Sequence, residues 1–579
     1  MRNFNYLHFF IFVLSGSLQA QYSKEVEEKI RTVEQSVGLY KFQVEGLANP
    51  TIEDRMRFYN VKGLSIAVVH NYKIEWAKGY GWADSAERRP VTTETLFEPG
   101  SISKSINAVG ILRLAQRKKI DLYKDINDYL VSWKFPYDSV SKNKKITLAD
   151  LLSHTAGLSQ HGFPGYYRGD TFPTVPEILD GKKPANTKPV RSLFVPGLKF
   201  EYSGGGTMVS QLIVMDKSEQ QYDAYMSEHV FVPIGMSNSL FTQPPPEARK
   251  KTLATGYSGN GKEIKGKYPI LIEQAAGGLW TTPTDLCKFI IEIQLSRQGK
   301  SNKVLSKKMT KKMLRPYQNK SAALGCFIEK RRGAKYFSHN AGNQGFSGIY
   351  YGSFKDGNGL AIVVNSDEGH HLIQEVVTSV VNTYKWKGFY TGEKVITKKS
   401  ITVSPDLLEK YVGAYKQKNT IVSITKKEDG LYYQAGGQQW KMYFDSDTTF
   451  FSRESVSNKL IHVDKNGKVL GFTKKAGEKD LGTSEKVGLF ALSEKQLDLY
   501  TGKYMDGENL LLIFKKGNHL FCDSGYGNPL IELHFLSATE FYIDEDFGAE
   551  DKFILDEKGN VKQIFVKHRE EHKSLIRVP

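Results

Sequence analysis

An internal repeat fills the C-terminal part of this 579-residue chain. The stretch LEKYVGAY (408–415) recurs 89 residues later as LDLYTGKY (497–504), and other segments recur in the same order. Each copy alternates short apolar runs with Gly, Asn and Asp turns, which predicts two small antiparallel β-barrels or sandwiches over 406–491 and 492–579. A linker is expected at 391–405. The other matching pairs are TTFF (448–451) with TEFY (539–542), and DKNGKV (464–469) with DEKGNV (556–561).

The preceding residues, 24–390, alternate helix-like and strand-like patterns. LSIAVVH (64–70) and LAIVVNS (360–366) are apolar and β-branched, as buried strands are. LADLLSHTAGL (148–158) and PTDLCKFIIEIQL (283–295) have helical spacing; before the second, Thr282 can cap the helix and Pro283 suits its first position. Interleaved helices and strands predict a mixed α/β or α+β domain; with the C-terminal repeats, the chain as a whole is expected to be α+β.

The first twenty residues, MRNFNYLHFFIFVLSGSLQA, have the pattern of a secretory signal peptide cleaved near Ala20. The alternative is a buried N-terminal helix. After residue 20 no run of 18 uninterrupted apolar residues occurs, so we expect a periplasmic or secreted protein without a transmembrane segment. The formal charge is 80 − 63 = +17, or +16 without Arg2. The lysines are spread along the chain without an aromatic-interleaved basic motif, which excludes a typical nucleic-acid-binding protein.

Three cysteines, Cys287, Cys326 and Cys522, are too few and too scattered for a disulfide framework. Buried free thiols are favoured over a Cys287–Cys326 pair. No spacing of Cys and His residues indicates a zinc site. HREEH (568–572) fits the H-x-x-E-H zinc pattern, but it follows a strand-like segment, with no helix long enough to carry a metalloprotease site. We therefore expect no metal and no organic cofactor.

The stretch LFEPGSISKSINAVGILRLAQ places a serine and a lysine at the start of an apolar helical pattern. Ser101 and Lys104 are three residues apart, so they share one helix face. A serine needs a base to become a nucleophile, and a buried lysine can act as that base. The alternative is a helix-capping serine with a surface lysine. The same spacing starts at Ser139 and Ser141, but in a Lys-rich loop that would bury no lysine.

Two further segments carry candidate functional groups. In VPGLKFEYSGGGTMVSQL, Tyr202 lies in a Gly-rich turn before a helix, and a phenol beside Lys104 can share a proton with it. In FSHNAGNQGFSGIYYG, His339 precedes small residues and a strand-like run. Such small residues let a substrate backbone lie against an edge strand, and the N–H near Gly342 could face a reacting carbonyl. The alternatives are a packing tyrosine and a surface histidine in a turn.

These three motifs together resemble the serine β-lactamase and penicillin-binding-protein superfamily, in its class C-like branch. The resemblance covers roughly residues 40–390. It includes the connecting segments LLSHTAGLSQHGFPGYY, YMSEHVFVPIGM and AAGGLWTTPTDLCKF. It implies a β-lactamase/transpeptidase-like fold, in which an all-α subdomain lies beside an α/β sandwich with the site between them. The C-terminal repeats resemble the lipocalin-like barrels that follow some D-aminopeptidase-type members.

The resemblance also implies roles for individual residues. Ser101 becomes the acylated nucleophile, Lys104 its proton partner, and Tyr202 the general base or proton shuttle. His339 stands where many members have the lysine of a K-T-G element. The backbone N–H groups of Ser101 and Gly342 become the oxyanion hole.

The chain departs from the family pattern at two substrate-binding positions. Gly204 replaces the Asn that many members carry two residues after the tyrosine, and His339 replaces a permanently charged lysine. Both changes favour the esterase and D-aminopeptidase-like members. His339, Asn340, Ala341 and Gly204 are the substrate-binding residues that the resemblance implies.

The resulting expectation is an exported serine hydrolase that acts through a Ser101 acyl-enzyme on esters or on amide bonds of D-residue-containing peptides. The substrate would be a small ester or a peptidoglycan-derived peptide, with weak β-lactam hydrolysis as a side activity. One alternative is a non-catalytic or slowly turning-over penicillin-binding-like sensor. Another is an envelope- or carbohydrate-binding protein whose binding sites lie in the repeats.

Overall fold

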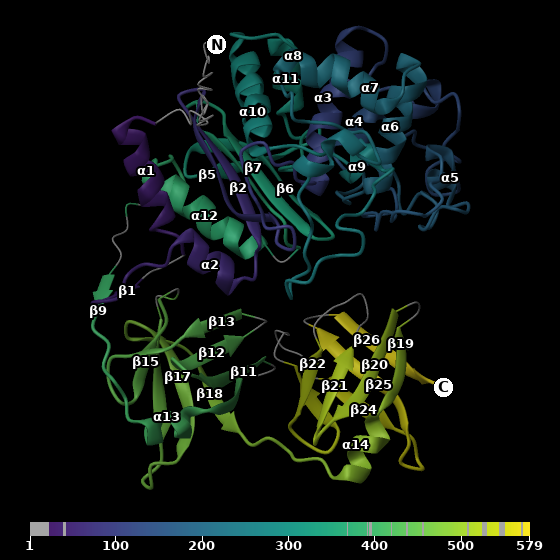
Figure 1. Ribbon diagram of the computed structural model, residues 1–579. Helices are drawn as coiled ribbons and strands as arrows, with labels where there is room; N and C mark the ends of the chain where they lie inside the picture. Colours follow the sequence, from purple (N-terminus) through teal and green to yellow (C-terminus); the bar gives the residue numbers. More distant parts are fainter. Residues whose placement is uncertain are drawn as a thin grey trace, which may run out of the picture.

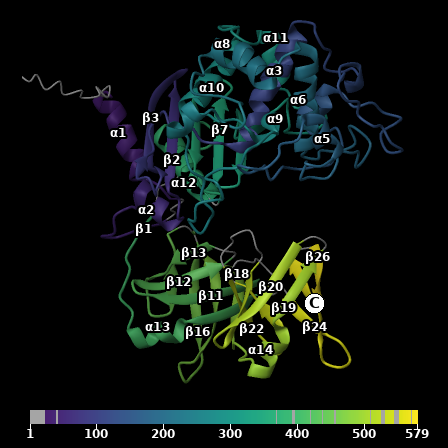
Figure 2. The ribbon, with the colours of Figure 1, turned by 45° about the vertical axis from the view of Figure 1, so that its right-hand side comes forward.

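The computed structural model shows a mixed α/β domain next to two β-barrels that lie side by side (Figures 1 and 2). It describes residues 22–579 except 39–41, 368, 391, 393–395, 418–419, 436–437, 454, 456, 507–508, 524–529, 544–550 and 569–570. The predicted signal peptide, residues 1–20, lies outside this described part.

A seven-stranded antiparallel sheet forms the centre of the mixed domain, in the order β4-β3-β2-β8-β7-β6-β5. The predicted strands at 64–70 and 360–366 correspond to its two neighbouring strands β2 and β8. The strands are β2 (Gly63–His70), β3 (Lys73–Asp84), β4 (Arg89–Pro90), β5 (Phe327–Arg331), β6 (Ala334–Asn343), β7 (Phe346–Ser353) and β8 (Gly359–Val364).

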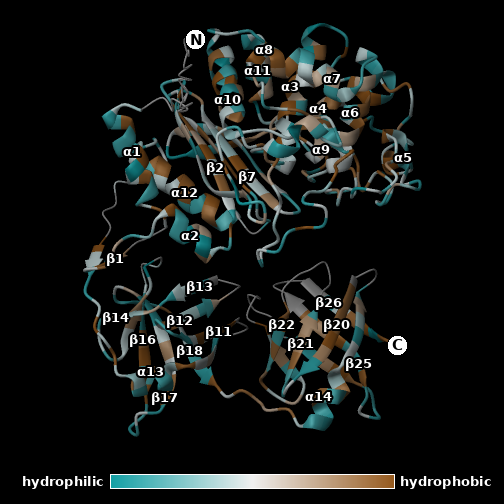
Figure 3. Ribbon diagram, in the orientation of Figure 1, coloured by the Kyte–Doolittle hydropathy of each residue, from teal (hydrophilic) through white to brown (hydrophobic). Residues whose placement is uncertain are grey.

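Both faces of this sheet are buried, and the period of two along β2 shows how. Ile66 and Val68 pack into a core with helices α1 (Lys24–Glu34), α2 (Ile52–Phe58) and α12 (His370–Thr383). Ala67 and Val69 point to the opposite face and join a larger core with α10 (Pro283–Gln298) and the helical subdomain. Hydrophobic residues accordingly dominate β2 and β7 (Figure 3).

The second core belongs to a helical subdomain beside the sheet, which confirms the predicted α/β sandwich with an adjoining α subdomain. Thr282 caps α10 by accepting the Asp285 N–H at 3.2 Å, as predicted. The helix expected at 148–158 is shorter and ends at Leu152. The subdomain's helices are α3 (Ser103–Gln116), α4 (Leu148–Leu152), α5 (Val175–Asp180), α6 (Gly204–Ser218), α7 (Tyr222–Met226), α8 (Val232–Ile234), α9 (Gln274–Gly277) and α11 (Lys307–Met313).

The two repeats form antiparallel barrels, as their sequence pattern predicted. Barrel 1 is a nine-stranded sheet whose end strands β13 and β14 are consecutive in the chain, and barrel 2 closes on itself. Barrel 1 comprises α13 (Pro405–Tyr411), β10 (Gly413–Gln417), β11 (Thr420–Lys427), β12 (Gly430–Ala435), β13 (Gln438–Lys441), β14 (Tyr443–Phe444), β15 (Thr449–Phe451), β16 (Asn458–Val463), β17 (Val469–Ala476) and β18 (Lys479–Val487). Barrel 2 comprises α14 (Glu494–Tyr500), β19 (Gly502–Asp506), β20 (Asn509–Lys516), β21 (His519–Asp523), β22 (Ile531–Phe535), β23 (Glu540–Tyr542), β24 (Asp551–Leu555), β25 (Val561–His568) and β26 (Glu571–Val578).

A pair of buried tyrosines explains the repeated Y-x-G-x-Y pattern. In barrel 1 the Tyr415 hydroxyl donates to the Tyr411 carbonyl at 2.5 Å, and in barrel 2 Tyr504 donates to Tyr500 at 2.8 Å. In both copies the first tyrosine of the pair donates to the carbonyl of a loop between two later strands. The same hydrogen bonds therefore tie the short helix to its barrel twice.

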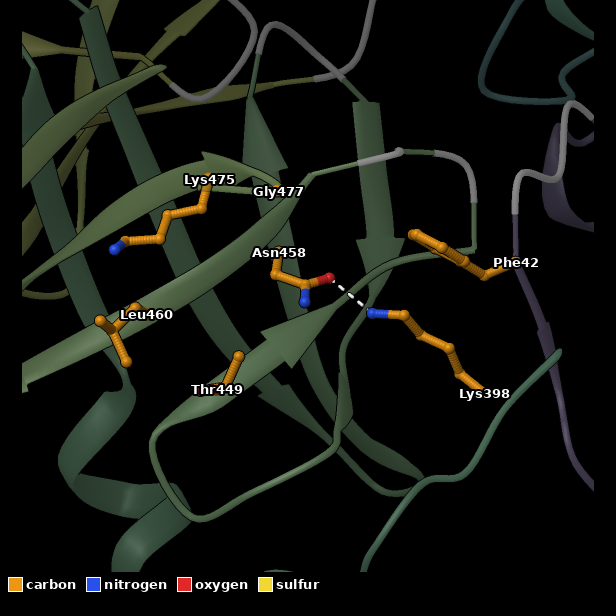
Figure 4. Close-up of a pocket in the computed structure, with 7 residues that line it drawn as sticks. All are labelled: Phe42, Lys398, Thr449, Asn458, Leu460, Lys475 and Gly477. Atoms are coloured by element: carbon orange, nitrogen blue, oxygen red, sulfur yellow. Dashed lines mark hydrogen bonds between the residues drawn. The ribbon is translucent and has the colours of Figure 1, made fainter. Parts of the chain in front are cut away.

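The N-terminal segment links the mixed domain to barrel 1. Strand β1 (Phe42–Val44) pairs in parallel with β9 (Ile396–Lys398), which lies in the span expected as a linker. The Lys398 ammonium donates to Asn458 Oδ1 at 2.6 Å (Figure 4). It also lies over the rings of Phe42 and Phe451. A cleft of about 390 Å³ remains beside this contact, lined by Phe42, Lys398, Thr449, Asn458, Leu460, Lys475 and Gly477.

The tyrosine pair yields a stability prediction. Tyr415→Phe removes a buried hydrogen bond and should lower the opening free energy of barrel 1 by about 1 kcal/mol. Hydrogen exchange of barrel 1 peptides in the full chain measures this loss. Tyr432→Phe is the matched control, because that hydroxyl bonds to Asp429 at the surface. Equal losses in both variants would contradict the role assigned to the buried pair.

Candidate active site

Ser101 lies in a single 3₁₀ turn, Gly100–Ile102, that leads into α3. Gly100 has φ +53°, and a Cβ there would lie 2.8 Å from Asn343 Oδ1 and 2.9 Å from the Gly342 carbonyl oxygen. Only glycine fits this conformation at such close approach. The turn is therefore pressed against the end of β6, which brings Ser101 beside Gly342.

Two buried serines of α3 fix the position of this turn. Ser103 Oγ donates to the Gly100 carbonyl at 2.6 Å and accepts the Leu279 N–H at 3.1 Å. Ser105 Oγ donates to the Gly325 carbonyl at 2.6 Å. The contacts with Leu279 and Gly325 join residues more than 170 positions apart in the chain, so no local sequence pattern indicates them.

Lys104 is buried, with 4% of its surface exposed. Its Nζ donates to Ser101 Oγ at 3.0 Å and to the Ala276 carbonyl of α9 at 2.7 Å. The same ammonium lies 5.0 Å from the centroid of the Tyr202 ring. The structure thus brings together Ser101, Lys104 and Tyr202, which come from two distant segments of the chain.

Three imidazoles surround Tyr202, which precedes α6. The His154 ring stacks on the phenol at 4.2 Å between centroids. His161 lies at 4.9 Å and His339, from β6, at 6.3 Å in an edge-on contact. Of the three, only His339 was singled out from the sequence.

The two buried imidazoles are neutral at pH 7. Burial, followed by the nearby Lys104 charge, lowers the pKa of His339 to about 4. Burial, followed by the Lys104 charge and the neighbouring His339 and His161 rings, holds the pKa of His154 well below its usual range. The site therefore has a neutral ring at His339.

Gly204 has no space for a larger side chain. A Cβ there would lie 2.9 Å from the His161 carbonyl oxygen and 3.1 Å from the Phe163 ring. The Gly204 N–H also donates to that carbonyl at 3.0 Å. The volume that an asparagine would need is thus filled by the 161–163 segment.

The end of β6 offers an unpaired backbone edge next to Ser101. Strand β5 pairs with β6 only up to Ser338. On that side, residues 339–343 have no strand partner within the part of the chain that the structure describes. Asn340 and Gly342 are exposed there and Ala341 is half-buried, so an extended substrate can lie along this edge.

Two buried carboxyl groups flank the site, and sequence reasoning missed both. Glu98 precedes Ser101 by three residues and accepts from Gln243 Nε2 at 3.1 Å; burial raises its pKa well above its usual range. Glu273 precedes α9, and burial raises its pKa to about 7. Among the residues that the structure describes, Lys104 forms no ion pair with either carboxyl group, and its polar contacts are a hydroxyl and a carbonyl oxygen.

Other predicted features fall outside this site. All three cysteines are buried, and Cys287 and Cys326 do not pair with each other, as expected. In the described ranges, no cluster of three or more His, Cys, Asp or Glu is placed to hold a metal ion. Residues 568 and 571 pair across the β25–β26 hairpin, so HREEH is flanked by strands; residues 569–570 lie outside the described part. None of the described helices is both long and apolar enough to cross a bilayer.

Comparison with known proteins places this site in a known context. The sequence model of the Beta-lactamase family matches residues 48–377, more than half of the chain. "Protein flp" of Staphylococcus aureus (strain MW2) is 25% identical in a 353-residue alignment that covers 57% of this chain and 65% of that protein. The chain thus spans slightly less than two thirds of that relative.

Two further proteins support the comparison. "Penicillin-binding protein 4*" of Bacillus subtilis (strain 168) is 22% identical over 393 residues, covering 65% of this chain and 84% of that protein. The solved octameric penicillin-binding protein homologue from Pyrococcus abyssi superposes with a TM-score of 0.51 at 19% identity, covering 82% of this chain and 97% of that one. This structural likeness shows a shared fold.

The lowered histidine pKa values predict an acid-sensitive mixed domain. Because the folded pKa of His339 is about 4 and the unfolded one about 6.5, the unfolded chain binds more protons between these values. Stability should be full above pH 6.5 and fall as the pH drops toward 4. Urea unfolding across this range measures how the free energy of unfolding changes with pH. In His339→Asn this slope should be smaller, by the equivalent of about one proton taken up on unfolding. Ser139→Ala, an exposed substitution that removes no titrating group, should keep the original slope.

Proposed function

We propose, on the premise that this chain belongs to the Beta-lactamase family, that it is an exported serine hydrolase that forms an acyl-enzyme at Ser101. The family match spans more than half of the chain, and this is a family of serine hydrolases with penicillin-binding relatives. The observation that carries the proposal is the 3.0 Å contact between Lys104 Nζ and Ser101 Oγ in a buried setting.

In the acylation step, Ser101 Oγ attacks the carbonyl carbon of an ester or amide. Lys104, in its amine form, accepts the hydroxyl proton across the 3.0 Å contact. The carbonyl oxygen becomes an oxyanion, which accepts hydrogen bonds from the backbone N–H groups of Ser101 and Gly342. The close approach of Gly100 to Gly342 supports this pairing of donors.

The intermediate then collapses by breaking the bond to the leaving group, which takes back a proton from Lys104 or Tyr202. A water molecule attacks the acyl-enzyme in the second half of the reaction, and the same two residues are the candidates for its base. The Lys104 ammonium over the Tyr202 ring supports a shared proton-handling role for the pair.

The substrate that we propose lacks a carboxylate next to the reacting bond. His339 is neutral at pH 7 and Gly204 offers no side-chain amide, so the fixed cation and the amide of many family members are both missing. Small esters and amide bonds of D-residue-containing peptides fit such a site better than β-lactams do. The unpaired edge at Asn340 and Ala341 supports an extended peptide as the substrate.

The proposed export rests on the N-terminal sequence alone. The apolar run after Arg2 and the small residues before Gln21 have the pattern of a cleaved signal peptide. The proposed location is the periplasm or the exterior of the cell, where a peptidoglycan-derived peptide is a natural substrate. The two barrels would be accessory modules of the same exported chain.

Labelling with a fluorescent serine-directed phosphonate tests the nucleophile. We expect the mature protein to be labelled and Ser101→Ala to remain unlabelled, with hydrolysis reduced by about 1,000-fold or more. Ser139→Ala is the matched control, because Ser139 has the same spacing to a lysine but lies in an exposed loop. p-Nitrophenyl esters, D-aminoacyl anilides and nitrocefin then distinguish the esterase, aminopeptidase and lactamase activities.

Each outcome bears on the proposal. Label that survives in Ser101→Ala, or a wild-type protein without label and turnover, would remove Ser101 as the nucleophile and favour a binding protein. Stable label on the wild type with no turnover of any substrate class would favour a penicillin-binding-like sensor that deacylates slowly.

A further inference from the structure

His154 lies in the segment LLSHTAGL, directly beyond the end of α4. Its backbone has φ +57°, the left-handed conformation that a residue with a large side chain rarely adopts. The side chain is buried, with 5% of its surface exposed. Strained backbone of this kind persists only where the surrounding contacts fix it.

Three contacts join His154 to the residues around Tyr202. The His154 carbonyl accepts the Glu201 N–H at 2.8 Å, and its Nδ1 accepts the Ser203 N–H at 3.2 Å. Between these two bonds, the imidazole stacks on the Tyr202 ring at 4.2 Å with 28° between the planes. One residue therefore holds the peptide units on both sides of the tyrosine as well as its ring.

We propose that His154 is the positioning residue of Tyr202 and sets the place of the phenol beside Lys104 and Ser101. This inference rests on the proposed function, because Tyr202 must handle a proton for its position to matter. The two hydrogen bonds and the stacking contact of His154 are called the His154 clamp below. The Lys104 ammonium lies 5.0 Å from the Tyr202 ring and donates to Ser101 Oγ, so the clamp acts on the reacting serine through Tyr202 and Lys104.

The clamp requires His154 Nδ1 to remain unprotonated, because only then can it accept the Ser203 N–H. The charged or titratable groups that face the ring are Lys104 from α3, His339 from β6 and His161. Together with burial they hold the pKa of His154 well below its usual range. The acceptor form therefore dominates at neutral pH.

The surrounding loop has other anchors that do not involve the His154 side chain. The Leu193 N–H donates to the Gly157 carbonyl at 2.8 Å, and the Gly197 N–H donates to the Thr155 carbonyl at 2.7 Å. The Ser203 hydroxyl also accepts the Gly206 N–H at 2.9 Å, which caps α6. Side-chain replacements at position 154 should therefore fold and perturb mainly Tyr202.

Three variants separate the parts of the clamp. His154→Asn keeps an acceptor atom at the same bond distance from the backbone and tolerates positive φ, but loses the stacked ring. His154→Phe keeps a ring but leaves the buried Ser203 N–H without its acceptor. His154→Ala loses both contacts. All are compared in the full mature chain with a p-nitrophenyl ester and with the serine-directed phosphonate.

We expect His154→Ala to lower kcat by about 100-fold while KM changes by less than about 3-fold, because the reacting groups are misplaced but the binding edge is intact. His154→Asn should recover about 10-fold of this loss, and His154→Phe should not. The pH–rate profile should shift in His154→Ala and His154→Phe and stay near wild type in His154→Asn. A merely structural role would lower the melting temperature without this pattern of rescue.

Two results would overturn the inference. One is a kcat of His154→Ala within about 3-fold of wild type. The other is His154→Asn performing no better than His154→Phe, in kcat and in pH profile. Should His154→Ala fail to fold, the comparison of the Asn and Phe variants still decides. A wild-type protein that phosphonate does not label would instead refute the proposed function, so the two failures are distinguishable.

Discussion

The buried contact between Lys104 and Ser101 is the interaction on which the rest of this site depends. A lysine with 4% of its surface exposed is costly unless its ammonium has partners. Here the partners are the Ser101 hydroxyl, the Ala276 carbonyl and the face of Tyr202. Each comes from a different element: the turn before α3, the short helix α9 and the segment before α6. Holding one amine in place thus requires the helical subdomain to be assembled around it.

The seam between sheet and helices makes this assembly possible. Gly100 lets the turn of Ser101 touch β6, and Gly325 lets α3 approach so closely that an added Cβ would lie 2.3 Å from Ala108 Cβ. Tyr350 of β7 donates to Ser105 Oγ at 2.9 Å across the same seam. Ser101 is therefore positioned from both sides of the domain, and a shift of the sheet against α3 would separate Ser101 from Gly342.

Local patterns in the sequence predicted the parts of the fold that depend on neighbouring residues. The apolar, β-branched runs identified β2 and β8, and the helical spacing with the Thr282 cap identified α10. The helix expected at 148–158 ended early because His154 takes a left-handed conformation to reach Glu201 and Ser203, a tertiary demand that no local pattern reveals. The sequence could not indicate that the Ala276 carbonyl accepts a hydrogen bond from Lys104, because every residue type has a backbone carbonyl.

The barrels show how one fold can be kept while its interior changes. The paired tyrosines make the same hydrogen bonds in both copies, so the framework of the repeat is retained. Lys459 in β16 pairs with Phe450, and Asp551 in β24 pairs with Phe541, so the two charged residues occupy equivalent positions. Both are buried, with 2% and 3% of their surface exposed, and they have opposite charge. A buried charged group is costly unless neighbouring groups of suitable polarity surround it. Residues of opposite charge at one position therefore require different surroundings, so the interiors of the two barrels have diverged. The two barrels therefore share a framework but are not interchangeable modules.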